Sequence, residues 1–281
     1  MSETLAHDPA PPEPRPDDDA VGKQHDEETP PSPRRRTRRL TAETLLMLVV
    51  PPLLVLLVFG GYAWWHEHTH LDSVEAQQLR WKTVWRLLLQ HVELTGMSAL
   101  LVVVIAIPLG IAMTRGPLRR AAPLVVGVAN GGQAAPSVGL IVLLAIWLGF
   151  GFWTAVLALT LYGVLPVLRN TITGLQGVDP TLVEAGRGVG MSSTAVLLRV
   201  EMPLAVPVIM AGLRTALVLI VGTAALATFI NAGGLGAIIT AGITNYRFRV
   251  PVAGAVLIAL LALLVEWLGR LLELLARPKG L

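Results

Sequence analysis

Long uncharged stretches separated by short polar segments dominate this chain. No Asp, Glu, Lys, Arg or His occurs from Thr44 to Trp65 or from Ala121 to Leu168. The second stretch is more than twice the roughly 20 residues that one membrane-crossing helix needs, so it predicts two helices joined by a turn. The apolar runs are continuous, whereas the strands of a membrane barrel alternate apolar and polar residues. The pattern predicts an all-α, polytopic transmembrane helical bundle.

The apolar runs and the charges at their ends predict about six spans. These cover residues 44–63, 92–113, both halves of 121–168 with a turn near Gly149–Phe152, 205–230 and 251–272. Arginines or lysines lie near the span ends on one side, and such an excess marks the cytoplasmic side of a membrane. We therefore expect both termini to be cytoplasmic. Arg247 and Arg249 fall on the other side and are exceptions to this pattern.

Composition divides the chain into five parts. Residues 1–40 are acidic and proline-rich, and we expect a disordered cytoplasmic tail because they contain too few apolar residues to fold. The tail ends in the cluster Arg34–Arg39, which suits anionic lipid headgroups. The remaining parts are an N-terminal membrane anchor (41–66, too long for a cleaved signal), an extracytoplasmic segment (67–91), a membrane core (92–275) and a cytoplasmic tail (276–281).

Overall composition narrows the chemistry. With 53% apolar and only 15% charged residues, the chain is too apolar for an ordinary soluble domain. It has no cysteine, which excludes disulfides and thiolate metal sites. His66, His68 and His70 would share a face only on a strand, so solvated histidines are the simpler reading and a metal site the alternative. We expect no metal site, and the net charge of +3 does not indicate a nucleic-acid partner.

The segment 176–205 is polar and glycine-rich, and we expect it on the cytoplasmic side. Asp179 can cap a helix that begins at Pro180, runs to about residue 187 and stops at Gly188 and Gly190. A second helix over about 193–201 can be capped by Ser192 or Ser193, and Pro203 is expected to end it. This helix–turn–helix unit has the form of a surface that docks onto a cytosolic partner.

Polar and small residues at membrane depth are candidates for a transport pathway. Asn130, Gln133 and Ser137 have helical spacing, which predicts one shared face, and Pro136 is expected to break the helix and free carbonyl groups. Amides at this depth face protein or water rather than lipid. Hydrogen bonding between helices and lining of a pathway both remain open.

Further candidates follow in the fifth span and after it. Thr223 is a small residue suited to close helix contact, as is Gly222. Gly233 and Gly234, within Ala232–Gly236, permit non-helical backbone near the outer side of the pathway, although close packing is an equally simple explanation. Arg214 lies inside the span, where it either extends to the inner interface or pairs with the cytoplasmic segment.

The cytoplasmic segment resembles the motif of membrane subunits of bacterial ABC importers. That motif reads Glu-Ala-Ala, three residues, Gly, nine residues, Ile, one residue, Leu-Pro. Here it appears with the same spacing as Glu184-Ala185-Gly186, then Gly190, then Val200, Met202 and Pro203. Gly186, Val200 and Met202 depart from it, and each replacement is again small or apolar.

A longer resemblance covers roughly residues 90–245 and is to the glycine betaine/carnitine/choline (osmoprotectant) permeases. The matching strings are Ile107–Ile111, Leu168–Thr171, Gly177–Pro180, Pro207–Ala216 and Ala232–Gly236, with a partial match over Ala129–Ser137. This resemblance implies a type I ABC importer (MetI-like) permease core in a bacterial inner membrane. The implied cargo is glycine betaine or a related quaternary ammonium compound, with methionine or another small metabolite as the alternative.

The resemblance also implies partners. Two copies of the permease would form the pathway, an extracytoplasmic binding protein would deliver the substrate, and cytosolic ATPase subunits would carry ATP and Mg. The motif positions Glu184, Ala185, Gly186, Gly190 and Pro203 would couple to that ATPase.

Two observations on the sequence itself agree with transport that is driven by ATP hydrolysis in a separate chain. The three lysines, Lys23, Lys82 and Lys279, do not lie in a phosphate-binding loop, so we expect no enzyme activity and no cofactor in this chain. A secondary transporter would need charges inside the membrane, and the second to fourth spans have none apart from Glu93 at the very start of the second span.

Overall fold

The computed structural model describes residues 42–276, and these are helical apart from turns, with no strand among them. The predicted acidic tail, its arginine cluster and the last five residues lie outside the described residues. The long helices are α1 (Ala42–His68), α3 (Trp81–Met113), α6 (Phe152–Gln176), α9 (Met202–Ala224) and α11 (Arg249–Ala276). The shorter ones are α2 (Ser73–Gln78), α4 (Ala122–Ala134), α5 (Ser137–Leu148), α7 (Pro180–Gly188), α8 (Ser193–Val196) and α10 (Gly236–Thr244), with 3-10 segments η1 (Gly116–Ala121) and η3 (Ala225–Ile230) and a π-helical turn η2 (Leu197–Glu201).

The predicted number of spans is confirmed. Within residues 42–276, five helices are long and apolar enough to cross a membrane, and α4 with α5 makes a sixth if that bent pair is one span. α3 begins at Trp81, whereas the predicted span begins at residue 92. α1 continues through Pro51 and Pro52 without interruption of the helix. The expected turn between the third and fourth spans lies at Gly149 and Gly151, which both have positive φ.

Small residues bring α3, α6 and α9 into close contact. A Cβ on Gly110 of α3 would lie 2.6 Å from the Thr171 side chain of α6. A Cβ on Gly212 of α9 would lie 2.7 Å from the Pro166 carbonyl oxygen of α6. Because the helices gain little from hydrophobic burial inside a membrane, such close backbone approach supplies the van der Waals contact that holds them together. Fully buried Val102, Leu159 and Ile220 complete this three-helix core.

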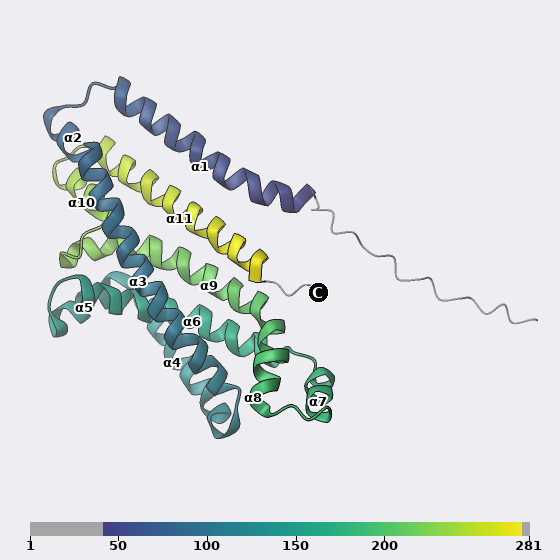
Figure 1. Ribbon diagram of the computed structural model, residues 1–281. Helices are drawn as coiled ribbons and strands as arrows, with labels where there is room; N and C mark the ends of the chain where they lie inside the picture. Colours follow the sequence, from purple (N-terminus) through teal and green to yellow (C-terminus); the bar gives the residue numbers. More distant parts are fainter. Residues whose placement is uncertain (1–41, 277–281) are drawn as a thin grey trace, which may run out of the picture. The chain divides into compact units, whose positions relative to one another are not determined.

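α1 lies alongside α11 (Figure 1) and is tied to it by one polar contact. The Trp267 indole N–H donates to the Leu48 carbonyl oxygen at 2.8 Å. Leu56 and Leu57 of α1 are about two-thirds exposed, at 69% and 64%. Apolar side chains exposed along a span are those that contact lipid, so α1 is a peripheral helix of the bundle.

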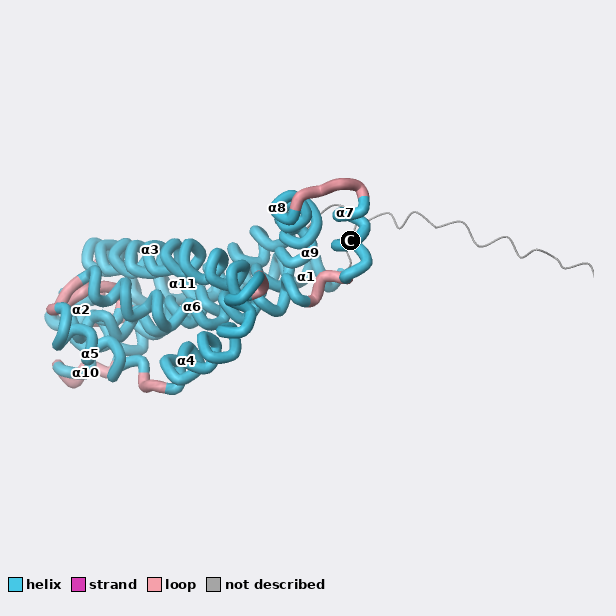
Figure 2. Tube along the Cα trace, turned by 90° about the horizontal axis from the view of Figure 1, so that it is seen from below, coloured by secondary structure: helices cyan, strands magenta, loops and turns pink. Residues whose placement is uncertain are grey.

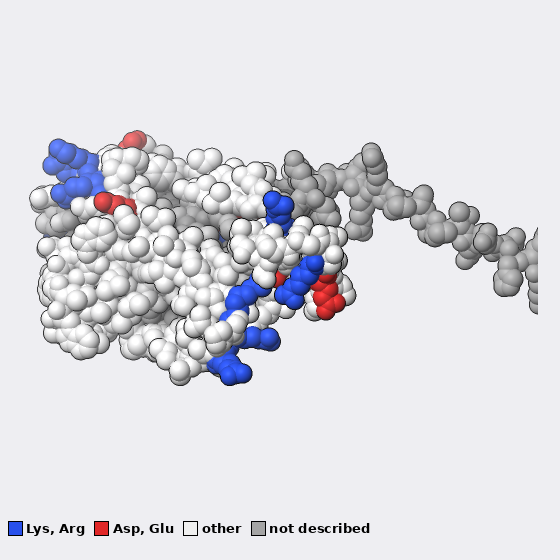
Figure 3. All heavy atoms as spheres, turned by 60° about the horizontal axis from the view of Figure 1, so that its bottom comes forward, with Lys and Arg blue, Asp and Glu red and all other residues white. Residues whose placement is uncertain are grey.

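The two ends of the bundle carry the charged residues that its middle lacks. α7 and α8 project from one end, and α2 and α10 lie at the opposite end (Figures 1 and 2). In Figure 3 the charged residues of the visible face gather at these two ends, and an uncharged band separates them. Such a band is what the apolar interior of a bilayer requires of a surface.

Candidate functional site

The first half of the predicted docking unit, α7, has a well-formed N-terminus. The Asp179 carboxylate accepts hydrogen bonds from the Thr181 backbone N–H at 2.9 Å and from the Thr181 hydroxyl at 2.8 Å. These hydrogen bonds, the backbone one first, hold the pKa of Asp179 below its ordinary value. Pro180 occupies the first turn, where its missing N–H is not needed. The predicted cap and start of this helix are therefore confirmed.

The turn after α7 is a Schellman motif centred on Gly190. Met191 N–H donates to the Gly186 carbonyl at 3.1 Å, and Gly190 N–H donates to the Arg187 carbonyl at 2.9 Å. Gly190 has φ +86°, a left-handed conformation that glycine adopts at little cost. The prediction that the helix stops at the glycines is confirmed.

The second half of the unit corrects the prediction for Pro203. The Ser192 hydroxyl caps α8 by accepting from Ala195 N–H, as expected. The helix does not end at Pro203, because it widens into the π-turn η2 and continues directly as α9. Met202 N–H bonds to the Leu197 carbonyl, five residues back. A π-turn relieves the conflict between a proline ring and the carbonyl four residues before it, so α8, η2 and α9 form one continuous rod.

The motif residues of α7 are divided between its two faces. Glu184 and Ala185 are exposed, whereas Gly186 is buried against α8 and η2. A Cβ on Gly186 would lie 3.4 Å from Val196 and 3.6 Å from both Met191 and Val200. α7 is therefore fixed to the rod through its buried face and presents Glu184 outward.

A charged cavity of about 370 Å³ lies between α7 and the end of α3. Its lining includes Glu184 and Arg187 of α7, Glu201 of η2, and Arg115 and Arg119 at and after the end of α3. Arg115 forms an ion pair with Glu201. The sequence does not predict that these two residues pair, because they lie 86 positions apart and only the fold brings them together.

The pathway candidates of the third span are not on one face. α4 ends at Ala134 and α5 begins at Ser137, with a bend of 98° between them. The predicted break at Pro136 is confirmed, but it separates Ser137 from Asn130 and Gln133, so their helical spacing does not give a common face. Asn130 is exposed on this chain.

Gln133 contacts the neighbouring span. Its Nε2 donates to the Tyr162 carbonyl of α6 at 2.9 Å, and the Tyr162 hydroxyl donates to the Gln133 carbonyl at 3.4 Å. Gln133 also lines a cavity of about 350 Å³ together with Arg169, Asn170 and Thr173. The interhelical hydrogen bond is therefore present, and the lining of a transport pathway by Gln133 stays a prediction.

The glycines after the fifth span form a loop locked onto α3. Gly233 and Gly234 have φ of +82° and +92°, so the expected non-helical backbone is confirmed. Gly234 N–H donates to Gln90 Oε1 at 3.3 Å, and Leu235 N–H donates to His91 Nδ1 at 3.2 Å. His91 also contacts the Val221 carbonyl through Nε2. Gln90 and His91 were not among the expected site residues, because residues 67–91 were predicted to form an external segment and α3 instead begins at Trp81.

Gly222 of the fifth span does not make the expected helix contact within this chain. A Cβ on Gly222 would have no atom within 4 Å in this chain. The Thr223 hydroxyl donates to Leu219 of its own helix at 2.6 Å. Gly212, one of the residues in the resemblance strings, makes the close approach instead.

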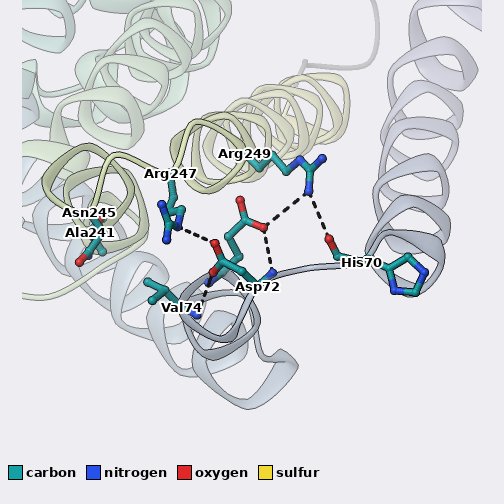
Figure 4. A network of polar contacts seen from close by, with 8 residues as sticks. His70, Asp72, Val74, Ala241, Asn245, Arg247 and Arg249 are labelled. Carbon is teal, nitrogen blue, oxygen red and sulfur yellow. Dashed lines mark hydrogen bonds and ion pairs between the residues drawn. The ribbon is translucent and has the colours of Figure 1, made fainter.

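Ion pairs explain three arginines that the sequence left open. Arg247 Nε lies 2.6 Å from Asp72 Oδ2, and Arg249 lies 3.6 Å from Glu75 and donates to the His70 carbonyl at 3.3 Å (Figure 4). These two arginines are thus neutralised by the segment before α3. This neutralisation explains how they can lie apart from the other arginines at span ends. Arg214 pairs with Glu273 of α11 at 3.3 Å, and among the described residues no ion pair joins it to the docking unit.

Asp72 and Glu75 also form a capping box at the start of α2. The Asp72 carboxylate accepts from the Val74 and Glu75 N–H groups, and the Glu75 carboxylate accepts from Asp72 N–H. The hydrogen bond from Glu75 N–H, followed by the nearby Arg247, lowers the pKa of Asp72. Among residues 42–276, no group of three or more His, Asp or Glu side chains is placed so that it could hold a metal ion.

Comparison with known proteins places this architecture in a family. Residues 106–277 match the family described as "Binding-protein-dependent transport system inner membrane component". The chain belongs to this family. It is therefore a multi-pass membrane component of a transport system, and the match includes α4 to α11 with the docking unit α7–η2.

Curated relatives of this permease have names that refer to osmoprotectants. It is 39% identical over 192 residues to the glycine betaine/carnitine/choline transport system permease protein OpuCB of Bacillus subtilis, covering 68% of this chain and 88% of that protein. It is 40% identical over 197 residues to the osmoprotectant import permease protein OsmW of Salmonella typhimurium, covering 68% of this chain and 91% of that protein. The choline transport system permease protein OpuBB of Bacillus subtilis is 38% identical over 192 residues, with 68% of this chain and 88% of that protein covered.

Solved structures share the permease's fold. A chain of the MetNI methionine ABC transporter in an inward-facing conformation superposes with a TM-score of 0.61 at 24% identity, covering 69% of this chain and 96% of that chain. A chain of an amino acid ABC transporter superposes with a TM-score of 0.59 at 20% identity, covering 73% of this chain and 99% of that chain. These similarities confirm the predicted MetI-like permease fold.

Proposed function

We propose that this permease is the membrane subunit of an ATP-driven importer for glycine betaine or a related quaternary ammonium osmoprotectant. The identity of about 40% to osmoprotectant permeases, over two-thirds of the chain, is the observation that carries the proposal. Two copies would enclose the pathway, and an extracytoplasmic binding protein would supply the substrate. ATP and Mg would bind to separate cytosolic ATPase subunits, and both termini of the permease would be cytoplasmic.

The docking unit α7–η2 would be the contact with the ATPase. Its first helix presents Glu184 and Ala185 outward, Gly186 fixes it to α8, and Gly190 sets the angle between the two helices. Because Pro203 lies inside a continuous helix, force applied to α7 would move α9 as a rod. Mechanical coupling requires a surface that binds the ATPase and a rigid connection from that surface to a membrane-spanning helix.

The pathway would run beside α4, α5, α6 and the loop after α9. Residues proposed to line it are Asn130, Gln133, Pro136, Ser137, Thr223, Gly233 and Gly234. The cavity beside Gln133 and the non-helical loop at Gly233 support this assignment.

Reconstitution tests the proposal. The permease, its genomic ATPase and its binding protein would be placed in liposomes, and uptake of labelled glycine betaine, carnitine, choline and methionine would be measured with and without ATP. We expect ATP-dependent accumulation of at least one quaternary ammonium compound and none of methionine. Accumulation against a gradient in vesicles that contain the permease alone would contradict the proposal.

A further inference from the structure

A buried glutamate joins the docking unit to the end of α3. Glu201, the last residue of η2, is 5% exposed and forms an ion pair with Arg115. Arg115 lies between the end of α3 and η1. Removing one partner from a buried ion pair leaves an uncompensated charge, so the pair strongly favours keeping these two segments together.

The two members of the pair belong to different mechanical parts. Glu201 is continuous with α8 on one side and with α9 on the other. Arg115 leads through η1 into α4 and α5, which we call the α4–α5 arm (residues 122–148). This arm carries Asn130 and Gln133, the pathway candidates, and contacts α6 through Gln133 and Tyr162.

Apolar packing joins the docking unit to the last turns of α3, where Leu197 of η2 and Ile111 share one cluster, and the ion pair extends this contact to Arg115. The charged cavity of about 370 Å³ separates α7 from Arg115 and Arg119. Within residues 42–276, no other ion pair connects the segment 176–205 with residues 114–121. The pair therefore spans the edge of a space into which α7 could move without displacing the arm.

We propose that Arg115 and Glu201 are positioning residues that transmit movement of the docking unit to the α4–α5 arm. This inference rests on the proposed function, because the movement would originate in the ATPase. An intact pair makes the arm follow the rod formed by α8, η2 and α9. Without the pair, the ATPase would still bind α7 and hydrolyse ATP, but the arm would not follow.

Coupling measurements in the full transporter test this inference. Glu201→Gln keeps the shape of the side chain and removes its charge, and Arg115→Ala removes the partner. We expect both variants to copurify with the ATPase and hydrolyse ATP, while solute imported per ATP falls about tenfold, within the range of a typical coupling free energy. The charge exchange Arg115→Glu with Glu201→Arg should restore part of this ratio. Arg120→Ala, an exposed η1 residue without an ion pair among the described residues, is the matched control.

A position-sensitive measurement separates transmission from simple stability. The chain contains no cysteine, so Leu124→Cys, on an exposed site of α4, gives a single reactive thiol. We expect its alkylation rate to differ between the resting and the vanadate-trapped transporter, and we expect this difference to vanish when Glu201→Gln is added. An unchanged difference, or an unchanged ratio of solute to ATP in the single variants, would overturn the inference.

The remaining outcomes are also decisive. If the single variants do not copurify with the ATPase, the charge-exchange variant tests the inference. Assembly and uptake that both return support transmission by the pair. Assembly that returns without uptake overturns the inference. Loss of assembly in all three variants overturns it too, because the pair would then serve folding alone. Failure of the proposed function is seen separately, in wild-type vesicles that accumulate solute without the ATPase.

Discussion

His91 of α3 and Val221 of α9 are joined by a hydrogen bond of 3.0 Å between the His91 Nε2 and the Val221 carbonyl oxygen. Since Leu235 N–H donates to Nδ1 of the same ring, Nδ1 is the acceptor and Nε2 carries the hydrogen. One fully buried side chain therefore holds a span, its neighbour and the glycine loop together.

Replacing His91 tests this lock. In His91→Phe the Val221 carbonyl and the Leu235 N–H lose their partner, so we expect a loss of roughly 2 kcal/mol or more in the free energy of unfolding, given the cost of buried unsatisfied groups. Thermal unfolding in detergent measures it. Leu89→Phe, at an exposed position of the same helix, should leave the melting temperature unchanged, and an equal loss in both variants would contradict the assignment.

Two glycines of the docking unit should respond oppositely to alanine. In Gly186→Ala the new Cβ meets its neighbours at ordinary contact distance, and the helix gains about 1 kcal/mol in propensity, so the variant should be more stable. In Gly190→Ala nothing obstructs the Cβ, but the left-handed backbone should cost about 1 kcal/mol. Comparing the melting temperatures of the two variants tests both expectations. A higher melting temperature for Gly190→Ala than for the unmodified protein would argue against the Schellman turn.

Coupling should depend on α7. Gly190→Pro removes the N–H that bonds to Arg187 and cannot adopt positive φ, and Glu184→Lys reverses the charge that α7 presents outward. We expect both variants to insert into the membrane yet hydrolyse ATP without import. Glu67→Lys, exposed near the far end of α1, is the control. Normal coupled uptake by both α7 variants would count against the docking unit.

Acid should weaken the α2 cap. The folded-state pKa of Asp72 lies below its unfolded-state value, so the cap contributes stability above the unfolded value and loses it as the pH falls through the folded one. Hydrogen exchange of the α2 amides, corrected for the intrinsic rate at each pH, should therefore accelerate at acid pH. Asp72→Asn should reduce this acceleration, and an identical pH dependence in the variant would show that another group is responsible.

The close contact of α6 with α9 can be tested within α9. Gly212→Ala places a Cβ 2.6 Å from Asn170 and 2.7 Å from the Pro166 carbonyl, and overpacking of this kind costs about 1–3 kcal/mol. Gly222→Ala, where the Cβ has open space, should not destabilise the chain. Equal melting temperatures for the two variants would contradict the described packing.

Local features of the sequence were sufficient for much of this architecture. Charge-free runs longer than a bilayer requires predicted the spans, because the cost of burying charge in lipid acts on each segment separately. Asp179, Ser192 and Gly190 predicted the ends of the docking helices, because capping involves only residues a few positions apart. The motif beginning at Glu184 indicated the family before any fold was known.

Only the tertiary structure decided which distant groups meet. Arg115 with Glu201, Arg214 with Glu273, and His91 with the loop at Gly234 are pairs that no local pattern specifies, because they depend on how whole helices pack. The same holds for the two prolines. The 98° bend at Pro136 divides Ser137 from Gln133, whereas the π-turn before Pro203 lets the helix continue, and a proline's local preference does not distinguish these outcomes.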